Sequence, residues 1–373
     1  MSPELQAIAE SLARIGMLLT GILVVLLTLL SAVRTFVLPR SARSRITETV
    51  FVLFYMGFKG LTKRARSYER ADRIMALYAP VTLLFLPVVL LAFILAGFAL
   101  VYWALGPYSL AETIRISGSS LLTLGFFTYQ DTGYLVIEFI EAAIGMILIG
   151  MLISYLPAMY SGFSRRETQV TLLEVRAGSP PSAVEMLKRA HRIRGIGYLH
   201  DLWTSWEIWF AEVEESHTSL TPLIFFRSPQ PDRSWVTAAG TVLDAAALMV
   251  SAVDIPRDPQ ADLTIRAGYL ALRRIADFFV IEYDAQPHPT DPISIARWEF
   301  DAALDDLAEG GVPLKEDREQ AWRDYAGWRV NYDIVLLALA DLTMAPYAPW
   351  SSDRSLPTGF TSGGRKALTP FRR

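Results

Sequence analysis

This 373-residue chain contains a run of hydroxyl, glycine and aromatic residues, SGSSLLTLGFFTY. These are the residue types in the chain that could do chemistry. Irregular backbone with hydroxyl side chains presents oxygen atoms, and rings of such oxygens can replace the hydration shell of a monovalent cation. K+ or Na+ could be carried in this way, and we expect no other cofactor and no metal site.

A short helix is expected directly before this run. Ser109 and Glu112 form an S-x-x-E capping box, so the helix should begin at Leu110. Through Leu122 it would have 13 residues and a length of about 20 Å, which reaches the middle of a bilayer without crossing it. Its carboxyl end carries a partial negative charge that favours a hydrated cation. Extended backbone at that depth must be buried in protein or line water, which predicts an oligomeric pore.

Three apolar segments could place this helix in a membrane. Residues 74–111 contain no charged residue, residues 133–157 contain two, and residues 17–33 contain none and extend to residue 38 beyond Arg34. Each is long enough to cross about 30 Å of hydrocarbon as a helix. A cleaved signal peptide is the alternative for the first segment. The acidic residues before it, and the lack of a small-x-small cleavage site, favour a membrane anchor.

Basic residues indicate the orientation of these segments. Nine Lys and Arg residues lie within residues 40–73, whereas the short outer connections carry only Arg115. This asymmetry predicts three crossings with the amino terminus outside and the carboxyl terminus in the cytoplasm. Residues 50–58 are too short to span, and could lie on an anionic lipid surface or pack against other membrane helices.

The remaining chain reads as soluble and helical. Apolar residues recur at helical spacing between Pro and Gly clusters, and no run of alternating strands is present, so we predict an all-α fold. The expected parts are a lead-in (1–16), a first transmembrane helix (17–38), a basic cytoplasmic or interfacial segment (39–73), a pore module (74–160), a cytoplasmic helical domain (161–350) and a disordered tail (351–373).

The soluble part offers no motif for an enzyme. It has no P-loop, no G-x-S-x-G and no zinc spacing, and the near-neutral net charge of −3 argues against a nucleic-acid partner. The tryptophans at positions 203, 206 and 209 have the spacing of a buried stripe. Glu214, Glu215 and His217 read as a solvated helix end rather than metal ligands. A cytoplasmic partner for this domain is expected but not identified.

Three ionisable residues near the candidate pathway could brace it. Glu138 and Glu141 share one face of the last membrane helix, and Arg115 lies one turn after the capping Glu112. Arg115 could pair with either glutamate behind the loop, or all three could be solvated at the membrane surface. Gly145 and Gly150 could provide a gating bend, or could be positions of close helix packing.

Residues 120–128, SLLTLGFFT, resemble the filter pattern T-x-x-T-V-G-Y-G-D of the bacterial two-helix, potassium-channel-like pore-loop family. Thr123 and Gly125 match that pattern, whereas Phe127 and Thr128 stand where it has glycine and aspartate. The resemblance covers roughly residues 74–166. The regions after the last membrane helix also resemble bacterial membrane proteins that carry an ion-channel domain.

The resemblance implies a homotetramer in the lipid of the bacterial inner membrane. The ion-pathway residues that the resemblance implies are Ser120, Thr123, Leu124, Gly125, Phe126 and Phe127. Each of the four copies would contribute residues 123–127 to one monovalent-cation pathway. The helical domain would associate below the pore or couple a signal to the last helix through Arg165 and Arg166. The alternative is a non-conducting membrane sensor or scaffold that retains the pore fold, since Phe127 replaces a filter glycine.

Overall fold

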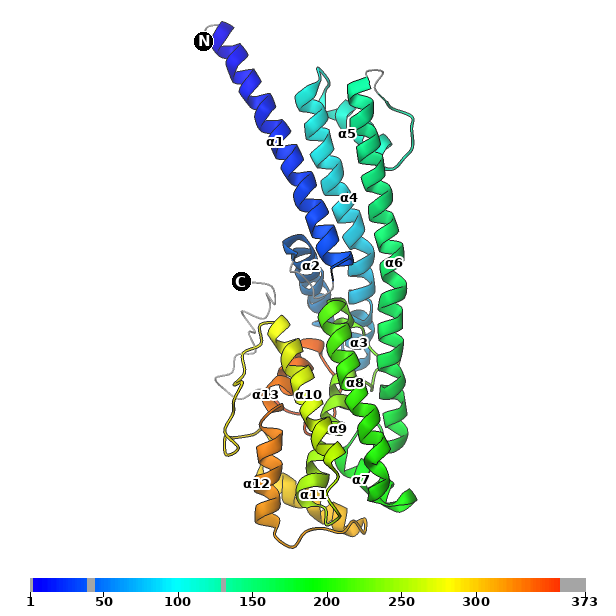
Figure 1. The fold of residues 1–373 in the computed structure, drawn as a ribbon, viewed down its shortest axis with the longest axis vertical. Helices are drawn as coiled ribbons and strands as arrows, with labels where there is room; N and C mark the ends of the chain where they lie inside the picture. Colours follow the sequence, from blue (N-terminus) through cyan, green and yellow to red (C-terminus); the bar gives the residue numbers. More distant parts are fainter. Residues whose placement is uncertain (1–2, 39–43, 129–131, 356–373) are drawn as a thin grey trace. The chain divides into compact units, whose positions relative to one another are not determined.

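The computed structural model describes residues 3–38, 44–128 and 132–355 (Figure 1). Every regular element in these ranges is a helix, and the single pair of bridged residues, Val253 and Leu314, forms no strand. The predicted all-α fold is therefore confirmed for the described part of the chain. Two compact units are present and are described separately: Met1–Leu53 with Pro80–Met159, and Phe54–Ala79 with Tyr160–Arg373.

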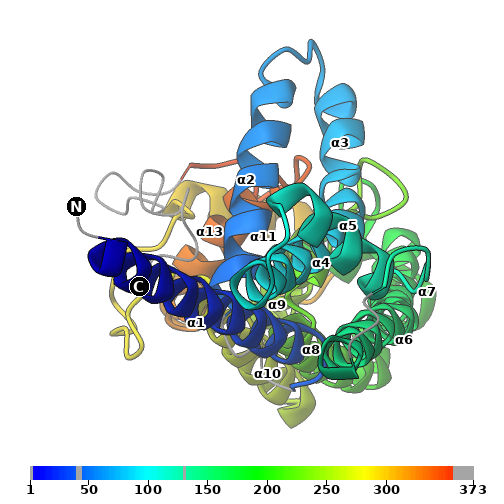
Figure 2. The same cartoon turned by 90° about the horizontal axis from the view of Figure 1, so that it is seen from above.

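The first unit consists of long apolar helices and one short helix. Its long helices expose many leucine, isoleucine and phenylalanine side chains, as expected for surfaces that face lipid. The short helix lies beside α4 and α6 at one end of the unit (Figures 1 and 2). The elements are α1 (Pro3–Phe36), the start of α2 (Arg45–Thr62), α4 (Tyr78–Leu105), α5 (Leu110–Leu121) and the first part of α6 (Thr132–Ala177).

Four helical stretches are long and apolar enough to cross a membrane. In the stretches that hold α1, α4 and α6, between 22% and 44% of the most apolar window is buried, whereas 94% of the window in α9 (Trp235–Ala252) is buried. Helix α9 is therefore already enclosed by protein and needs no lipid to cover it. Its apolar sequence is explained by a place in the core of the second unit.

Small residues bring α1 and α4 together. A Cβ atom on Gly21 would lie 2.6 Å from the carbonyl oxygen of Gly97, and one on Gly97 would lie 3.0 Å from that of Gly21. Both distances leave no room for a side chain between the two backbones. Close approach at small residues is the usual packing of membrane helices, because lipid provides no hydrophobic force between them.

Helix α6 extends well beyond the apolar segment 133–157. Helix α6 contains 46 residues, which corresponds to about 69 Å, and continues past Pro157 to Ala177. Its residues up to Met159 belong to the first unit and those from Tyr160 to the second. The apolar segment 133–157 is therefore one part of a longer continuous helix. A helix tolerates an internal proline when its neighbours satisfy the freed carbonyl.

The second unit is a helical domain around α9. Nearly every residue of α9 is buried, and it packs against α7, α10, α12 and α13, while α8 packs along α10. Gly268 lets α10 approach α9 and α8, because a Cβ atom there would lie 2.5 Å from Leu243 and 2.9 Å from Phe210. The remaining elements are α3 (Tyr68–Ala76), α7 (Ala183–Arg194), η1 (Ile196–Leu199), α8 (His200–Ser219), η2 (Thr221–Phe225), α10 (Pro259–Phe278), α11 (Arg297–Glu309), α12 (Arg318–Arg329) and α13 (Asp333–Thr343).

The basic segment contains two helices, α2 and α3. The environments expected for residues 50–58, an anionic lipid surface or other membrane helices, do not account for all of its contacts. The rings of Tyr55 and Tyr78 pack on Phe225 of η2, with centroids 6.0 and 5.3 Å apart respectively. Asp72 of α3 is buried and forms an ion pair with Arg227. This segment is therefore attached to the helical domain within the second unit, by contacts with residues more than 140 positions away in the chain.

The first five residues of the predicted disordered tail, 351–355, are ordered by contacts, so the prediction is wrong for them. Ser351 is buried, and Arg354 pairs with Glu299 at 3.0 Å, so residues 351–355 are part of the helical domain. Residues 356–373 lie outside the described residues.

Candidate functional site

The candidate pathway begins at the carboxyl end of α5. The capping box that was predicted at its start is present: Glu112 N–H donates to Ser109 Oγ at 3.3 Å, and Ser109 N–H donates to Glu112 Oε2 at 2.8 Å. Helix α5 begins at Leu110 as expected and ends at Leu121, one residue earlier than predicted.

The backbone after α5 turns back on the helix instead of extending at once. Leu124 N–H donates to the carbonyl of Ser119 at 2.8 Å, and Thr123 N–H donates to that of Ser120 at 2.9 Å. This pair of bonds is a Schellman cap with Thr123 at the position that glycine usually occupies. Its φ of 54° is left-handed, which is strained for a β-branched residue. The expectation of extended backbone directly after Leu122 is therefore wrong.

The rest of the loop is attached to α5 through Ser119. Phe127 N–H donates to Ser119 Oγ at 3.0 Å, and Gly125 has a φ of 72° that glycine adopts without strain. Leu124, Phe126 and Phe127 are 56%, 63% and 44% exposed. Three large apolar side chains thus lie uncovered on one short loop, which marks a surface that lipid or another protein covers.

The carbonyl oxygens of this loop are its available ligands. Among the described residues, no hydrogen bond is donated to the carbonyls of residues 123–127. The side-chain hydroxyls of Ser120 and Thr123, in contrast, donate hydrogen bonds within the chain. Ser120 Oγ donates to the carbonyl of Glu138 at 2.7 Å, and Thr123 Oγ1 donates to that of Leu122 at 2.8 Å. Ser120 therefore attaches α5 to α6 rather than lining a pathway.

Glu141 is the centre of a buried polar cluster behind α5. Its carboxyl oxygens lie 2.9 Å from Tyr102 Oη on α4 and 2.5 Å from Ser117 Oγ on α5. Ser117 Oγ also lies 3.1 Å from the carbonyl of Leu95. Three helices therefore meet at one carboxyl group. This cluster fixes the position of α5 between α4 and α6.

The predicted ion pair behind the loop is not formed. Arg115 is exposed and, among the described residues, makes no ion pair with Glu138 or Glu141. Glu138 instead accepts a hydrogen bond from Thr128 Oγ1 at 2.8 Å. The braces are therefore hydroxyl groups, which can be desolvated at a much lower cost than a guanidinium ion. The assignment of Arg115 as a brace is corrected accordingly.

Gly145 and Gly150, the glycines of α6 considered for a gating bend, have different surroundings. A Cβ atom on Gly145 would lie 2.2 Å from the carbonyl oxygen of Leu121, so Gly145 is a position of close packing against the end of α5. No atom lies within 4 Å of the corresponding point on Gly150. Helix α6 is continuous through both residues. A gating bend at Gly150 therefore stays a prediction.

Arg166 lies in the interior of the second unit rather than at a membrane surface. Its Nη1 donates to the carbonyl of Leu223 at 2.7 Å, and its Nη2 donates to that of Phe226 at 2.6 Å. Glu167 provides the counter-charge at 2.7 Å. Arg166 thereby joins the end of α6 to η2. The sequence does not indicate these contacts, because the two carbonyls lie 57 and 60 residues further along the chain.

His217 completes this buried group, and its prediction as part of a solvated helix end is wrong. Its Nε2 lies 3.2 Å from Arg166 Nη1, and its ring packs on Trp235 with centroids 4.8 Å apart. Arg166 has no acceptor, so Nε2 must accept and the proton must lie on Nδ1, which is 3.1 Å from Ser216 Oγ. Burial, and then the charge of Arg166, lower the pKa of His217 well below its ordinary value.

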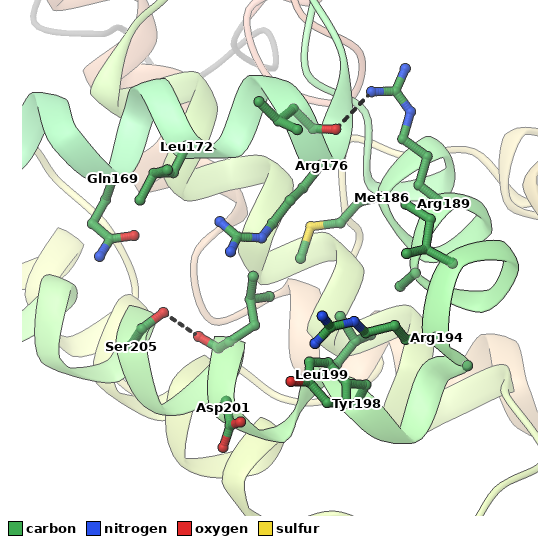
Figure 3. Close-up of a pocket in the computed structure, with 15 residues that line it drawn as sticks. Gln169, Leu172, Arg176, Met186, Arg189, Arg194, Tyr198, Leu199, Asp201 and Ser205 are labelled. Carbon is green, nitrogen blue, oxygen red and sulfur yellow. Dashed lines mark hydrogen bonds between the residues drawn. The ribbon is translucent and has the colours of Figure 1, made fainter.

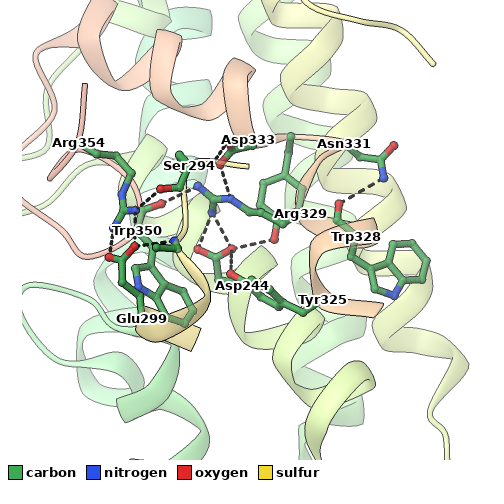
Figure 4. A network of polar contacts seen from close by, with 12 residues as sticks. Asp244, Ser294, Glu299, Tyr325, Trp328, Arg329, Asn331, Asp333, Trp350 and Arg354 are labelled. Carbon is green, nitrogen blue, oxygen red and sulfur yellow. Dashed lines mark hydrogen bonds and ion pairs between the residues drawn. The ribbon is translucent and has the colours of Figure 1, made fainter. Parts of the chain in front are cut away.

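A second buried polar network joins α9, α12 and α13 (Figure 4). Arg329 donates to both carboxylate oxygens of Asp244, at 2.7 and 2.8 Å, and to Asp333 at 2.7 Å. Tyr332 Oη donates to Asp244 at 2.8 Å. Burial raises the pKa of Asp244, and the charge and hydrogen bonds of Arg329 oppose that rise. The network is saturated with internal partners and is structural.

The second unit also has a cavity of about 530 Å³ between the end of α6, α7 and the start of α8 (Figure 3). Met186 lies at its buried floor, and Arg176, Arg189 and Arg194 line it. The sequence does not indicate this site, because its residues come from four elements, α6, α7, η1 and α8, without a common motif.

The described residues contain no group of three or more His, Asp or Glu side chains that could hold a metal ion. No family model, curated protein or solved structure matches the chain. Function must therefore be inferred from the residues and their geometry.

Proposed function

We propose that the chain is a potassium-channel-like integral membrane protein whose copies together enclose a pathway for a monovalent cation. The observation that carries this proposal is the attachment of α5, a capped helix of 12 residues, to two membrane-length helices. The loop that follows α5 has carbonyls that receive no hydrogen bond from the described residues. A helix of that length ends inside a bilayer, where irregular backbone needs protein or water around it.

The loop has the groups that a cation requires. The carbonyls of residues 123–127 receive no hydrogen bond from the described residues, so they could replace water around K+ or Na+. The carboxyl end of α5 adds a partial negative charge at the same place. No single loop surrounds an ion, and several copies, four by the resemblance noted above, would have to do so.

The exposed side chains of the loop favour assembly. Leu124, Phe126 and Phe127 are large and uncovered in one copy, and contact with neighbouring copies would bury them. The proposed location is the bacterial inner membrane with the carboxyl terminus in the cytoplasm. The proposed role is transport rather than enzymatic catalysis, and the helical domain is assigned to assembly or signal input.

A non-conducting sensor or scaffold is the second candidate. It is favoured by the bulk of Phe127, which stands where the filter pattern has glycine and hinders the backbone conformation of a filter. Such a protein would retain the helices and the assembly but would carry no current.

Cation flux from liposomes tests the proposal against this alternative. Purified full-length protein is reconstituted into vesicles loaded with K+ or with Na+, and efflux is measured with an ion-sensitive dye. Efflux that scales with protein content supports a pore. Intact oligomers that release neither ion, over a range of pH and voltage, would favour the scaffold. A Gly145→Leu variant, which should displace α5, is the matched control for leak through the lipid.

A further inference from the structure

The cavity of the second unit has the size and the walls of a small-molecule site. Its volume of about 530 Å³ lies within the range of roughly 300–1,000 Å³ that ligand pockets occupy. Met186, Leu199 and Leu202 form a buried apolar floor, while Val175 and Ile193, 76% and 70% exposed, lie at its edge. Exposed apolar residues around a buried floor are typical of a surface that binds something.

The charges at the cavity favour an anion. Arg189 is neutralised by Glu185 at 2.5 Å and is held in place by the carbonyl of Val175 at 3.0 Å. Arg176 and Arg194 have no ion pair among the described residues. Asp201 is the single acidic residue among those that line the cavity. The guanidinium groups of Arg176 and Arg194 are thus balanced only by the single carboxylate of Asp201. The lining of the cavity therefore has an excess of positive charge.

One of these arginines also provides a flat surface. The guanidinium of Arg194 lies over the ring of Tyr198, with its carbon 4.5 Å from the ring centroid. Stacking of this kind orients the planar fork of arginine, which can then bind a carboxylate, sulfonate or phosphate with two parallel hydrogen bonds. The same stack offers a face on which a planar ligand can lie.

We propose that this cavity binds a small soluble organic anion with a planar apolar body. The acidic group lies between Arg176 and Arg194, and the body lies on Tyr198 and the floor at Met186. One wall of the cavity, from Gln169 to Arg176, belongs to α6, the same helix that runs from Thr132. Occupancy therefore acts on α6 and supplies the signal of the proposed channel. The signal to the channel through α6 rests on the proposed function, whereas binding of the anion to the cavity does not.

Binding is tested with full-length protein in lipid nanodiscs by calorimetry, with 2-naphthalenesulfonate as the probe. The Arg176→Gln and Arg194→Gln variants each remove a charged hydrogen-bond donor and are expected to weaken binding roughly tenfold or more. Arg192→Gln, on the same helix but outside the cavity, is the matched control and should bind as the unmodified chain does. Equal affinity in all three variants, or no binding to the unmodified chain, overturns the proposal.

Two further probes separate the anion from the planar body. Inorganic sulfate carries the charge alone, and 2-naphthol carries the neutral ring alone. Both are expected to bind at least tenfold more weakly than 2-naphthalenesulfonate. Equal affinity for sulfate would reduce the cavity to a simple anion site, and equal affinity for 2-naphthol would assign binding to lipid or to apolar surface. Either result contradicts the proposal.

The effect on α6 has a separate readout. Liposome flux is compared with and without the probe, in the unmodified chain and in Arg194→Gln. A change in flux that the variant abolishes supports regulation. Binding without any change in flux overturns the regulatory step and leaves the site standing. Absence of flux in every condition counts against the pore itself, and calorimetry still reports on the site.

Discussion

Nη1 of Arg166 donates a hydrogen bond to Nε2 of His217 across 3.2 Å in the interior of the helical domain. A permanent cation beside an imidazole keeps that imidazole neutral, and burial acts in the same direction. The pair joins α6 to α8 with the help of the carbonyls of Leu223 and Phe226. Protonation of His217 would place two cations in contact, so this join is expected to be sensitive to acid.

The first prediction is that acid destabilises the second unit through His217. The unfolded chain takes up a proton near pH 6.5 that the folded chain does not bind, because the folded pKa is lowered. The free energy of unfolding is therefore complete above pH 6.5 and decreases below it, by up to about 1.4 kcal/mol per pH unit. Thermal unfolding of the full-length protein between pH 7.5 and 5 measures this slope.

His217→Gln should flatten that slope, because the amide oxygen still accepts from Arg166 and no group is left to titrate. His200→Gln is the matched control, since His200 is exposed and pairs with Asp258 at 3.0 Å. An identical slope in His217→Gln and in the unmodified chain would contradict the assignment of acid sensitivity to this residue.

The second prediction compares two glycines of one helix. Gly145→Ala would place a methyl group 2.2 Å from the carbonyl oxygen of Leu121, so the helices must separate, at a cost of about 1–3 kcal/mol. Gly150→Ala meets no atom within 4 Å and should leave stability unchanged or slightly raised. Thermal stability of the purified variants checks this contrast. Equal stability of the two would show that α5 does not pack on α6 in this way.

The Gly150→Ala variant also tests the proposed gating bend. If Gly150 bends when a pathway opens, Gly150→Ala should reduce cation flux while the folded protein stays as stable as before. Unchanged flux would remove Gly150 from the gating account and leave it as an ordinary membrane-helix residue.

The third prediction concerns the buried charge network. Arg329→Met leaves Asp244 buried without a cation and should cost about 3–5 kcal/mol. Arg323→Met, on the same helix, removes an exposed pair with Glu319 at 3.6 Å and should cost less than about 1 kcal/mol. Chemical denaturation measures both. Adding Asp244→Asn to Arg329→Met should recover part of the loss, since one of the two uncompensated buried charges is removed while that of Asp333 stays. Failure to recover any stability would argue against a charge effect.

The fourth prediction concerns Glu141. Glu141→Gln can accept from Tyr102 through its carbonyl and donate to Ser117 through its amide, so most of the stability should remain. Glu141→Ala removes both contacts and leaves buried hydroxyl groups without partners, at a cost of about 1–3 kcal/mol. Thermal unfolding in detergent distinguishes the two. Equal losses in both variants would mean that the carboxylate charge, and not the hydrogen bonds, holds α5.

What the sequence predicts correctly here is local. The cap of α5 depends on Ser109 and Glu112, three residues apart, and the buried tryptophan stripe of α8 depends on helical spacing alone. The membrane-length helices follow from the lengths of their apolar runs.

What the sequence does not predict depends on distant partners. Arg166 lies next to another arginine in the sequence, and nothing nearby indicates that it is buried. Its hydrogen-bond acceptors are carbonyls at η2, far along the chain. Arg115 and Glu141 are opposite in charge and lie close enough in the sequence to suggest an ion pair. The carboxyl group of Glu141 instead bonds to hydroxyls from α4 and α5. The Schellman cap at Thr123 escapes prediction because threonine rarely adopts a left-handed φ.

The most direct measurement of a pore uses the absence of cysteine from the chain. Thr123→Cys introduces a single thiol at the loop, and a charged methanethiosulfonate reagent is added to reconstituted protein while cation flux is recorded. We expect the reagent to block flux through Thr123→Cys and to leave Glu10→Cys, with its thiol on the exposed face of α1, unaffected. Flux that continues unchanged after complete labelling of Thr123→Cys would contradict a pathway through this loop.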